Sequence, residues 1–456
     1  MNKFVCLLRP LVLGAVILSF LVACSGAGDK EPVSMEFWTR QTQDDRMAVI
    51  NLLVETYNTL NTDQVVKAVP VEENDMALQI RTSASAGTLP GVAEIDAEIA
   101  IAMGSEGLVD TAVHQEIIEG IGNDSFYAGA LKLFQNSENE YSGIPFNGMI
   151  QAIWYRSDWF AEAGLEPPST WDNILKAAEY FTDPEANQYG ILVGTMETES
   201  YDEQCFTPIA MSNNALMLDD NGNVVFNSPA MREALTFYAE LARYNPPGPQ
   251  TWRGRDYYLQ GKMAMFFYST FIMDDLALEN VAEGSLTNEN FEDLSGAAFD
   301  PELVKATQAQ SVIGNKTESS FGAITGLSIL NADDEAKRES SKQFVQYLFE
   351  KDNYITYLHM SPGGMLPTIK SVSSDSDFLN DPKGVYQRYG TDKIIALNEG
   401  FDDLKSFGIV NGKRFELASV VYSKKIIPQM IYKVTQEGMD IDEALAWAQG
   451  EIEKLQ

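Results

Sequence analysis

The sequence predicts an α/β protein of more than one domain, with a doubly wound parallel sheet near its amino end. Two observations carry this prediction. Apolar strand patterns at residues 33–39, 64–71 and 92–95 alternate with helical patterns at 44–60 and 75–86. The chain has 456 residues, more than one domain usually holds. A βαβαβ order places the strands in parallel, with ligands at their carboxyl ends.

Further helices and a further strand follow along the chain, and each has a local signal. A serine and a proline at 228 and 229 supply a cap and a first helical residue for a long helix. Residues 280–320 are polar and show no clear period, which suggests a mobile insertion. The other elements are predicted as helices at 157–163, 170–181, 334–350 and 441–455 and a strand at 323–330.

The amino terminus has the pattern of an export signal. Lys3 and Arg9 precede an uncharged apolar run at 11–22, which is too short to span a bilayer comfortably. The run ends in LVAC at 21–24, which resembles the cleavage and acylation site of bacterial lipoproteins. We therefore predict a signal peptide at 1–23, lipid attachment at Cys24 and a tether at 24–33. An ordinary signal peptide or a short membrane anchor is the alternative.

Cysteine content and charge limit the classes of function. Once the signal is removed, Cys24 and Cys205 remain, and with Cys24 acylated no internal disulfide can form. A formal charge of −34 repels phosphate backbones, so nucleic-acid binding is not expected. The same charge could favour a cationic ligand, or it could be an ordinary solvated surface.

Signature motifs of enzymes are missing from the sequence. The chain has two histidines, and we find no zinc, redox, phosphate-loop or nucleophile-elbow motif, so we predict neither a metal nor a cofactor. The turn at 219–223 begins like a calcium loop but lacks the required glycine and glutamate. A secreted glycoside hydrolase remains the enzyme alternative, because 66 acids can always supply a carboxylate pair.

A series of short motifs in order resembles extracellular solute-binding protein family 1, the group of maltose-binding protein. The strongest run is YSGIPFN at 141–147, followed by IWYRSD at 153–158, AEAGL at 161–165 and PPSTWD at 167–172. Weaker matches are LPGV at 89–92, QGKMAM at 260–265, GGMLP at 363–367 and DEAL at 442–445. Together these motifs cover nearly all of the chain after the signal.

The resemblance implies a two-lobed periplasmic-binding-protein-like fold, in which each lobe is a doubly wound sheet flanked by helices and hinge strands join the lobes. We expect the chain to cross between lobes after Pro145, near Phe321 and near Pro362. The amino-terminal lobe would comprise 34–146 plus 321–361. The carboxyl-terminal lobe would comprise 147–320 plus 362–456.

The resemblance also implies a ligand cleft between the lobes, where carboxylates and amides bind hydroxyls and aromatic rings cover a sugar face. The candidate ligand-binding residues are Trp38, Gln43, Asp44, Asp96 and Glu98 from one lobe and Asn147, Glu197, Tyr201, Tyr268 and Ser269 from the other. Trp252 and Arg414 are weaker candidates for the same role.

The expected function is that of the substrate-binding lipoprotein of an ABC importer, without catalytic activity. It would capture a sugar by hinge closure, deliver it to the permease, and contact the membrane only through the lipid on Cys24. We expect a monomer that is exported and faces the periplasm or the cell exterior. A polyamine or another cationic solute is the alternative ligand.

Overall fold

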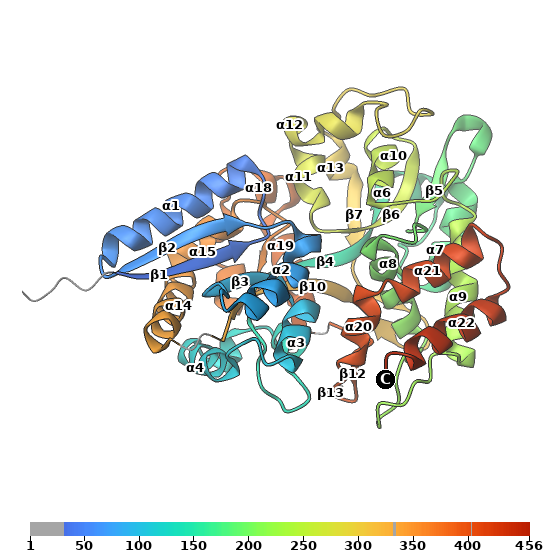
Figure 1. Cartoon of the computed structure of the whole chain (residues 1–456). Coiled ribbons are helices and arrows are strands. Elements are labelled where there is room, and N and C mark those ends of the chain that lie inside the picture. Colours follow the sequence, from blue (N-terminus) through green and yellow to red (C-terminus); the bar gives the residue numbers. More distant parts are fainter. Residues whose placement is uncertain (1–31, 332–333, 403) are drawn as a thin grey trace, which may run out of the picture.

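The computed structural model describes residues 32–331, 334–402 and 404–456. The predicted signal peptide, Cys24 and nearly all of the tether lie outside the described residues. Two halves, each with helices packed on strands, meet along shared strands in the middle of the molecule (Figure 1). Within these ranges, no helix is both long and apolar enough to cross a bilayer.

The first half is built on three parallel strands and has the predicted βαβαβ order. β1 lies between β2 and β3 in the sheet, and α1 and α14 pack against these strands. The bounds agree with the sequence prediction to within two residues, because each strand is a short apolar run closed by a polar turn. Its elements are β1 (Val33–Thr39), α1 (Asp44–Leu60), β2 (Gln64–Pro70), α2 (Glu73–Ala86), β3 (Val92–Asp96), α3 (Ala97–Ser105), α4 (Thr111–Ile121), α5 (Ala128–Phe134), α14 (Glu335–Leu348) and α15 (Lys351–Leu358).

The second half is built on β6, which lies between β5 and the end of β4 (Ile144–Arg156) in the same sheet. Its helices begin where the sequence signals them: Ser228 caps α9 by accepting from the backbone of Met231, and Thr170 caps α7 in the same way. Its elements are α6 (Ser157–Ala163), α7 (Trp171–Phe181), β5 (Tyr189–Leu192), α8 (Ser200–Ser212), α9 (Pro229–Ala242), α10 (Arg255–Leu259), β6 (Met263–Ser269), α11 (Ile272–Ala277), α12 (Glu279–Ala282), α13 (Leu303–Ala306), β7 (Thr307–Gln310), β8 (Ile313–Gly314), β9 (Glu318–Ser319), α21 (Ile426–Thr435) and α22 (Ile441–Glu453).

Two long strands run from one half into the other. β4 (Ile144–Arg156) pairs with β10 (Phe321–Ile329) along its first part, and with β6 and β7 along its second part. The short strand β11 (Leu366–Pro367) also pairs with β4, at Gly148 and Asn147. The register of β4 and β10 shifts at Thr325, which marks an irregularity in the middle of the shared sheet.

The segment between β11 and α21 lies where the two halves meet. Its helix α20 packs on α3 of the first half, while residues of its β12–β13 hairpin bond to the Asp219–Asn223 turn of the second half. Its elements are α16 (Lys370–Ser373), α17 (Ser376–Leu379), α18 (Val385–Tyr389), α19 (Thr391–Glu399), β12 (Ile409–Val410), β13 (Lys413–Arg414) and α20 (Leu417–Ser423).

The interpretation of residues 280–320 as a mobile insertion is wrong. This segment carries β7, which forms a four-residue ladder with β4 from Ile153 to Arg156. It also carries Leu294, Leu303 and Val304, whose side chains are buried in the core. The segment belongs to the sheet and core of the second half, although its loops and one-turn helices leave no period in the sequence.

Candidate functional site

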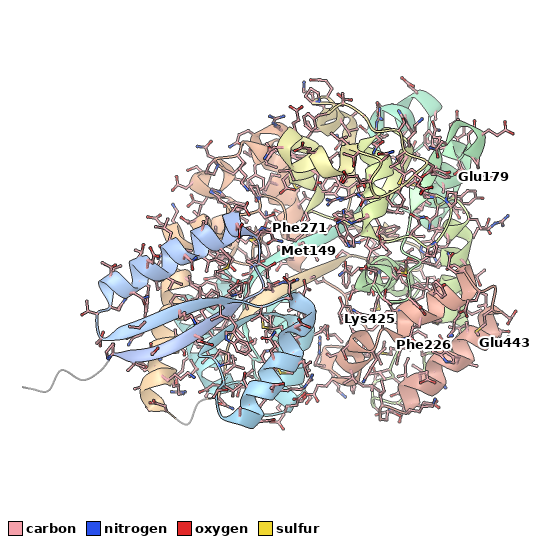
Figure 2. The ribbon with its side chains drawn as sticks, turned by 45° about the horizontal axis from the view of Figure 1, so that its top comes forward. Met149, Glu179, Phe226, Phe271, Lys425 and Glu443 are labelled. Atoms are coloured by element: carbon pink, nitrogen blue, oxygen red, sulfur yellow. The ribbon has the colours of Figure 1, made fainter. Side chains whose placement is uncertain are left out.

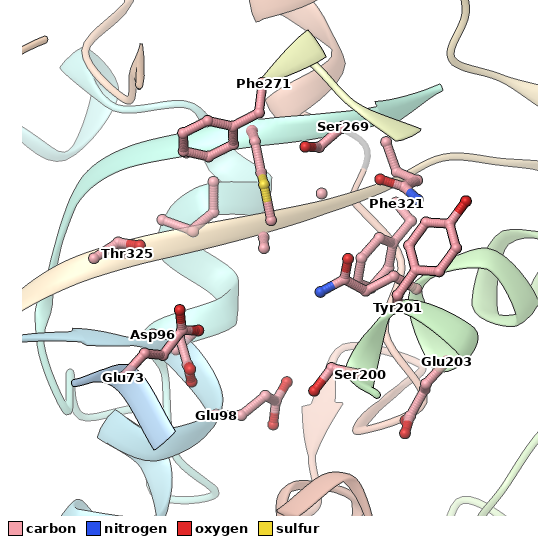
Figure 3. Close-up of a pocket in the computed structure, with 18 of the residues that line it drawn as sticks. Glu73, Asp96, Glu98, Ser200, Tyr201, Glu203, Ser269, Phe271, Phe321 and Thr325 are labelled. Atoms are coloured by element: carbon pink, nitrogen blue, oxygen red, sulfur yellow. The ribbon is translucent and has the colours of Figure 1, made fainter. Parts of the chain in front are cut away.

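A cavity of about 550 Å³ lies between the two halves, next to the strands that they share (Figure 3). This volume suits a small ligand. Side chains from the ends of β1 and β3 line it on one side, and side chains from α8, β6 and α20 line it on the other. Met149 and Phe271 lie where the halves meet, and Lys425 lies on the edge of the second half that faces the first (Figure 2).

The wall from the first half is a network of charged and amide groups that bond to one another. Arg40 follows β1; its guanidinium pairs with Glu73 and donates to the Thr325 hydroxyl at 3.2 Å. The buried Gln41 amide donates to Glu94 at 3.0 Å and accepts from Arg46, also at 3.0 Å. Most hydrogen-bonding capacity on this wall is therefore already used within the protein.

Asp96 ends β3 at the edge of the cavity and begins the next helix. Its Oδ1 accepts from the backbone N–H of Ile99 at 2.8 Å, so it caps α3. Burial raises the pKa of Asp96 to about 6, although the nearby Arg40 guanidinium acts in the opposite direction. One carboxyl oxygen is thus fixed by the helix, and the group titrates close to neutral pH.

Glu98 makes an ion pair across the cavity instead of facing it freely. Its carboxylate accepts from Arg414 Nη2 at 2.5 Å and from the hydroxyl of Ser419. The Arg414 side chain has no exposed area, and the hairpin that carries it rests on the Asp220 turn of the second half. The pair therefore holds the first half to the segment that covers the second.

The wall from the second half presents aromatic rings whose hydroxyls point away from solvent. The Tyr201 hydroxyl donates to the Phe267 carbonyl at 2.5 Å, and the Tyr268 hydroxyl accepts from Arg255 at 2.8 Å. Arg255 is in turn held by Asp275 at 3.0 Å. The two tyrosine rings lie 6.3 Å apart with 51° between their planes, and their fixed orientation suits contact with an apolar ligand face.

The sequence matches the model of the bacterial extracellular solute-binding protein family over residues 41–355. The chain belongs to this family. A solute-binding protein takes up and releases its solute unchanged, so the chain is not an enzyme. Within the described part of the chain, no group of three or more His, Cys, Asp and Glu side chains is placed to hold a metal ion.

Known proteins resemble this solute-binding protein in sequence and in fold. The putative ABC transporter periplasmic-binding protein YcjN of Escherichia coli is 29% identical to it, over 96% of this chain and 98% of its own length. A solute-binding protein of Agrobacterium radiobacter in complex with ribitol shares the fold, with a TM-score of 0.70, 18% identity and coverage of 93% of this chain and 99% of its own. The maltose-bound MalE3 of T. maritima also has a TM-score of 0.70, with 16% identity and coverage of 93% and 100%.

The structure of this solute-binding protein brings most of the predicted site residues to one cavity. The residues that line it are Gln43, Asp96, Glu98, Asn147, Tyr201, Tyr268 and Ser269, together with the weaker candidate Trp252. Arg414 does not line it but contacts Glu98, which does.

Three predicted residues lie elsewhere. Trp38 is packed in the core, with 7% of its surface exposed and its indole N–H donating to Glu36 at 2.8 Å. Asp44 is an exposed residue in the first turn of α1, and Glu197 is exposed in the loop before α8. None of the three lines the cavity.

Several residues that line the cavity escaped the sequence reasoning. Arg40 could have been found, because it directly follows a predicted strand. Glu203 and Phe271 have no such signal, and Lys425 reaches the cavity only because the carboxyl-terminal segment folds back between the halves.

Proposed function

We propose that the protein is the substrate-binding subunit of an ABC importer and captures an uncharged, hydroxyl-rich solute, a sugar or a related polyol. The observation that carries this proposal is the mixed wall of the second half, where Tyr201 and Tyr268 offer ring faces beside amide and carboxyl groups. Sugars need both kinds of partner. The binding of ribitol and of maltose by proteins with the same fold supports this ligand class.

The charge of the cavity supports a neutral ligand over a polyamine. Five acids and four bases line the cavity, although the whole chain carries −34. Glu73 and Glu98 already pair with arginines, and burial raises the pKa of Glu203 to about 8, so that this carboxyl is protonated at pH 7. A cation would find few free negative charges here.

Capture would occur by closure of two lobes about the shared strands. We assign 34–146 plus 321–361 to one lobe and 147–320 plus 362–456 to the other. The pairing pattern supports this division, since β4 and β10 each continue from one half into the other and β11 joins them. Ligand contacts from both sides stabilise the closed form, which a transporter can recognise.

Delivery to a membrane permease and anchoring by lipid on Cys24 complete the proposal. The similarity to a putative ABC transporter periplasmic-binding protein supports the first, and the apolar run that ends in Cys24 supports the second. Labelled fatty acid should enter the exported protein and should fail to enter a Cys24→Ser variant. Labelling that persists in the variant would exclude Cys24 as the lipid site.

Calorimetry with purified protein tests the ligand class. We expect at least one sugar or sugar alcohol to bind and polyamines to give no heat. X-ray scattering should show a smaller radius of gyration with the bound ligand than without it. Binding of a polyamine alone would overturn the proposed ligand, and an unchanged radius would overturn closure.

A further inference from the structure

Four buried polar side chains at the cavity lack an ordinary hydrogen-bond partner within the described part of the chain. Asn147, Gln151, Glu203 and Ser269 are 4%, 4%, 5% and 8% exposed. Among the residues that the structure describes, the one contact of their side-chain polar atoms is from the Gln151 amide to Cys205 Sγ, at 4.0 Å. Buried polar groups are normally bonded, and two atoms of this set, Asn147 Nδ2 and Glu203 Oε2, are enclosed without any partner among the described residues.

The four residues are neighbours. Asn147 and Gln151 lie on the same face of β4, since residues an even number apart share a face of a strand. Gln151 is directly opposite Ser269 in the ladder of β4 and β6. Glu203 lies two residues before Cys205 on α8, the helix that the Gln151 amide touches. All four line the cavity.

Their chemistry fits hydroxyl groups. Two amides, a hydroxyl and a carboxyl supply both donors and acceptors. The Glu203 carboxyl faces Lys425 and Glu98 from other elements, but burial dominates and raises its pKa to about 8. A protonated carboxyl can donate a hydrogen bond as well as accept one, and a ligand hydroxyl can take part in both bonds.

We propose that Asn147, Gln151, Glu203 and Ser269 form the subsite that binds adjacent hydroxyls of the solute, with Glu203 as its specificity-determining residue. This inference rests on the proposed function and deepens it. Within the described chain these polar groups have no partner, or in Gln151 only the contact to Cys205 Sγ, and they gain ordinary partners when the solute enters. The first-half wall, whose groups bond to one another, contributes less to the choice of solute.

Substitution of Glu203 tests the subsite with the sugar or polyol that binds best in the calorimetric screen. Glu203→Gln keeps a donor and an acceptor, so its Kd should stay within about threefold of the parent value. Glu203→Met keeps the bulk but removes both, and its Kd should rise by roughly 30-fold. Asn147→Leu and Ser269→Ala should each raise Kd by roughly tenfold.

Two controls separate lost binding from a damaged fold. The ligand-free Glu203→Met protein should melt no lower than the parent, because the substitution removes an unpaired buried group. Asp202→Asn changes the adjacent buried carboxyl, which does not line the cavity, and should leave Kd unchanged.

Deoxy analogues of the ligand identify which hydroxyl is bound. Loss of the hydroxyl that Glu203 contacts should weaken binding to the parent but add no further loss in Glu203→Met. If no sugar or polyol binds the parent, the proposed function and this subsite both fall. If one binds and Glu203→Met, Asn147→Leu and Ser269→Ala all keep Kd within threefold, the subsite is wrong and the proposed function stands.

Discussion

The two walls of the cavity treat their polar groups in opposite ways. On the first half, Arg40 is paired with Glu73, Gln41 bonds to Glu94 and Arg46, and Glu98 is held by Arg414. On the second half, Asn147, Gln151, Glu203 and Ser269 are buried, and their side chains have, as far as the described chain extends, a single contact, from Gln151 to Cys205 Sγ at 4.0 Å.

The difference indicates that the two halves have different roles in binding. Groups that already bond to one another gain little from a ligand, whereas unpaired buried groups gain a full hydrogen bond. The second half would therefore choose the solute, and the first half would close over it and hold the closed form. Each of the following variants tests one side of this comparison.

The largest expected effect is on the contact that joins the halves. Glu98→Gln removes the charge that balances Arg414, whose Nε and Nη1 have no other partner among the described residues. We expect the free energy of unfolding to fall by about 3 kcal/mol in urea titrations, because a buried guanidinium is left uncompensated. Every ligand should bind more weakly by the same factor, since only the closed population changes.

A double variant controls for the lone charge. Glu98→Gln combined with Arg414→Gln should recover most of the lost stability, because no unbalanced charge remains. If Glu98→Gln strongly lowers the affinity for one sugar and leaves the affinity for another unchanged, then Glu98 selects the solute. The inference that only the second half chooses the solute is then wrong.

The next effect concerns buried acids without a counter-charge. Asp202 is buried on the second half, and burial raises its pKa from 3.8 to about 9. The folded protein thus holds this proton more tightly than the unfolded chain, so its contribution to stability is complete below pH 4 and is lost as pH rises toward 9. Between pH 5 and 6.5, parent stability should fall by about 2 kcal/mol more than that of Asp202→Asn. Parallel stability curves would contradict this.

A smaller effect is expected from the aromatic wall. Tyr268→Ala removes a ring face and should weaken the binding of a sugar by about 1.5 kcal/mol, which is roughly a tenfold rise in Kd. Tyr268→Phe should bind nearly as well as the parent, since the hydroxyl is directed to Arg255 and away from the ligand. Calorimetry of both variants with one sugar decides between a role for the ring and a role for the hydroxyl.

The smallest effect belongs to the first-half rim. Gln43 lines the cavity but is exposed, and the Gln43→Ala variant should change the free energy of ligand binding by less than about 0.5 kcal/mol. If Gln43→Ala lowered the ligand affinity as much as Glu203→Met does, the first half would recognise the solute as closely as the second.

Local signals in the sequence account for what could be predicted of the fold and the site. Strand β1, helix α1 and Asp96 at the end of β3 follow from patterns only a few residues long. Trp38 could not be placed this way, because the end of a strand does not show which face is buried. The Glu98 and Arg414 pair joins residues 316 positions apart, and no local pattern encodes such a contact. The unpaired state of Glu203 appears only when every neighbour is known.

The path of β4 has one more consequence. Asn147 and Gln151 sit on the strand that passes from one half to the other, so any twist between the halves also turns the side chains that face the solute. Ligand binding and rotation between the two halves therefore both involve the backbone of β4. A variant designed to bind a new ligand through these residues should therefore also differ in the angle between the two halves.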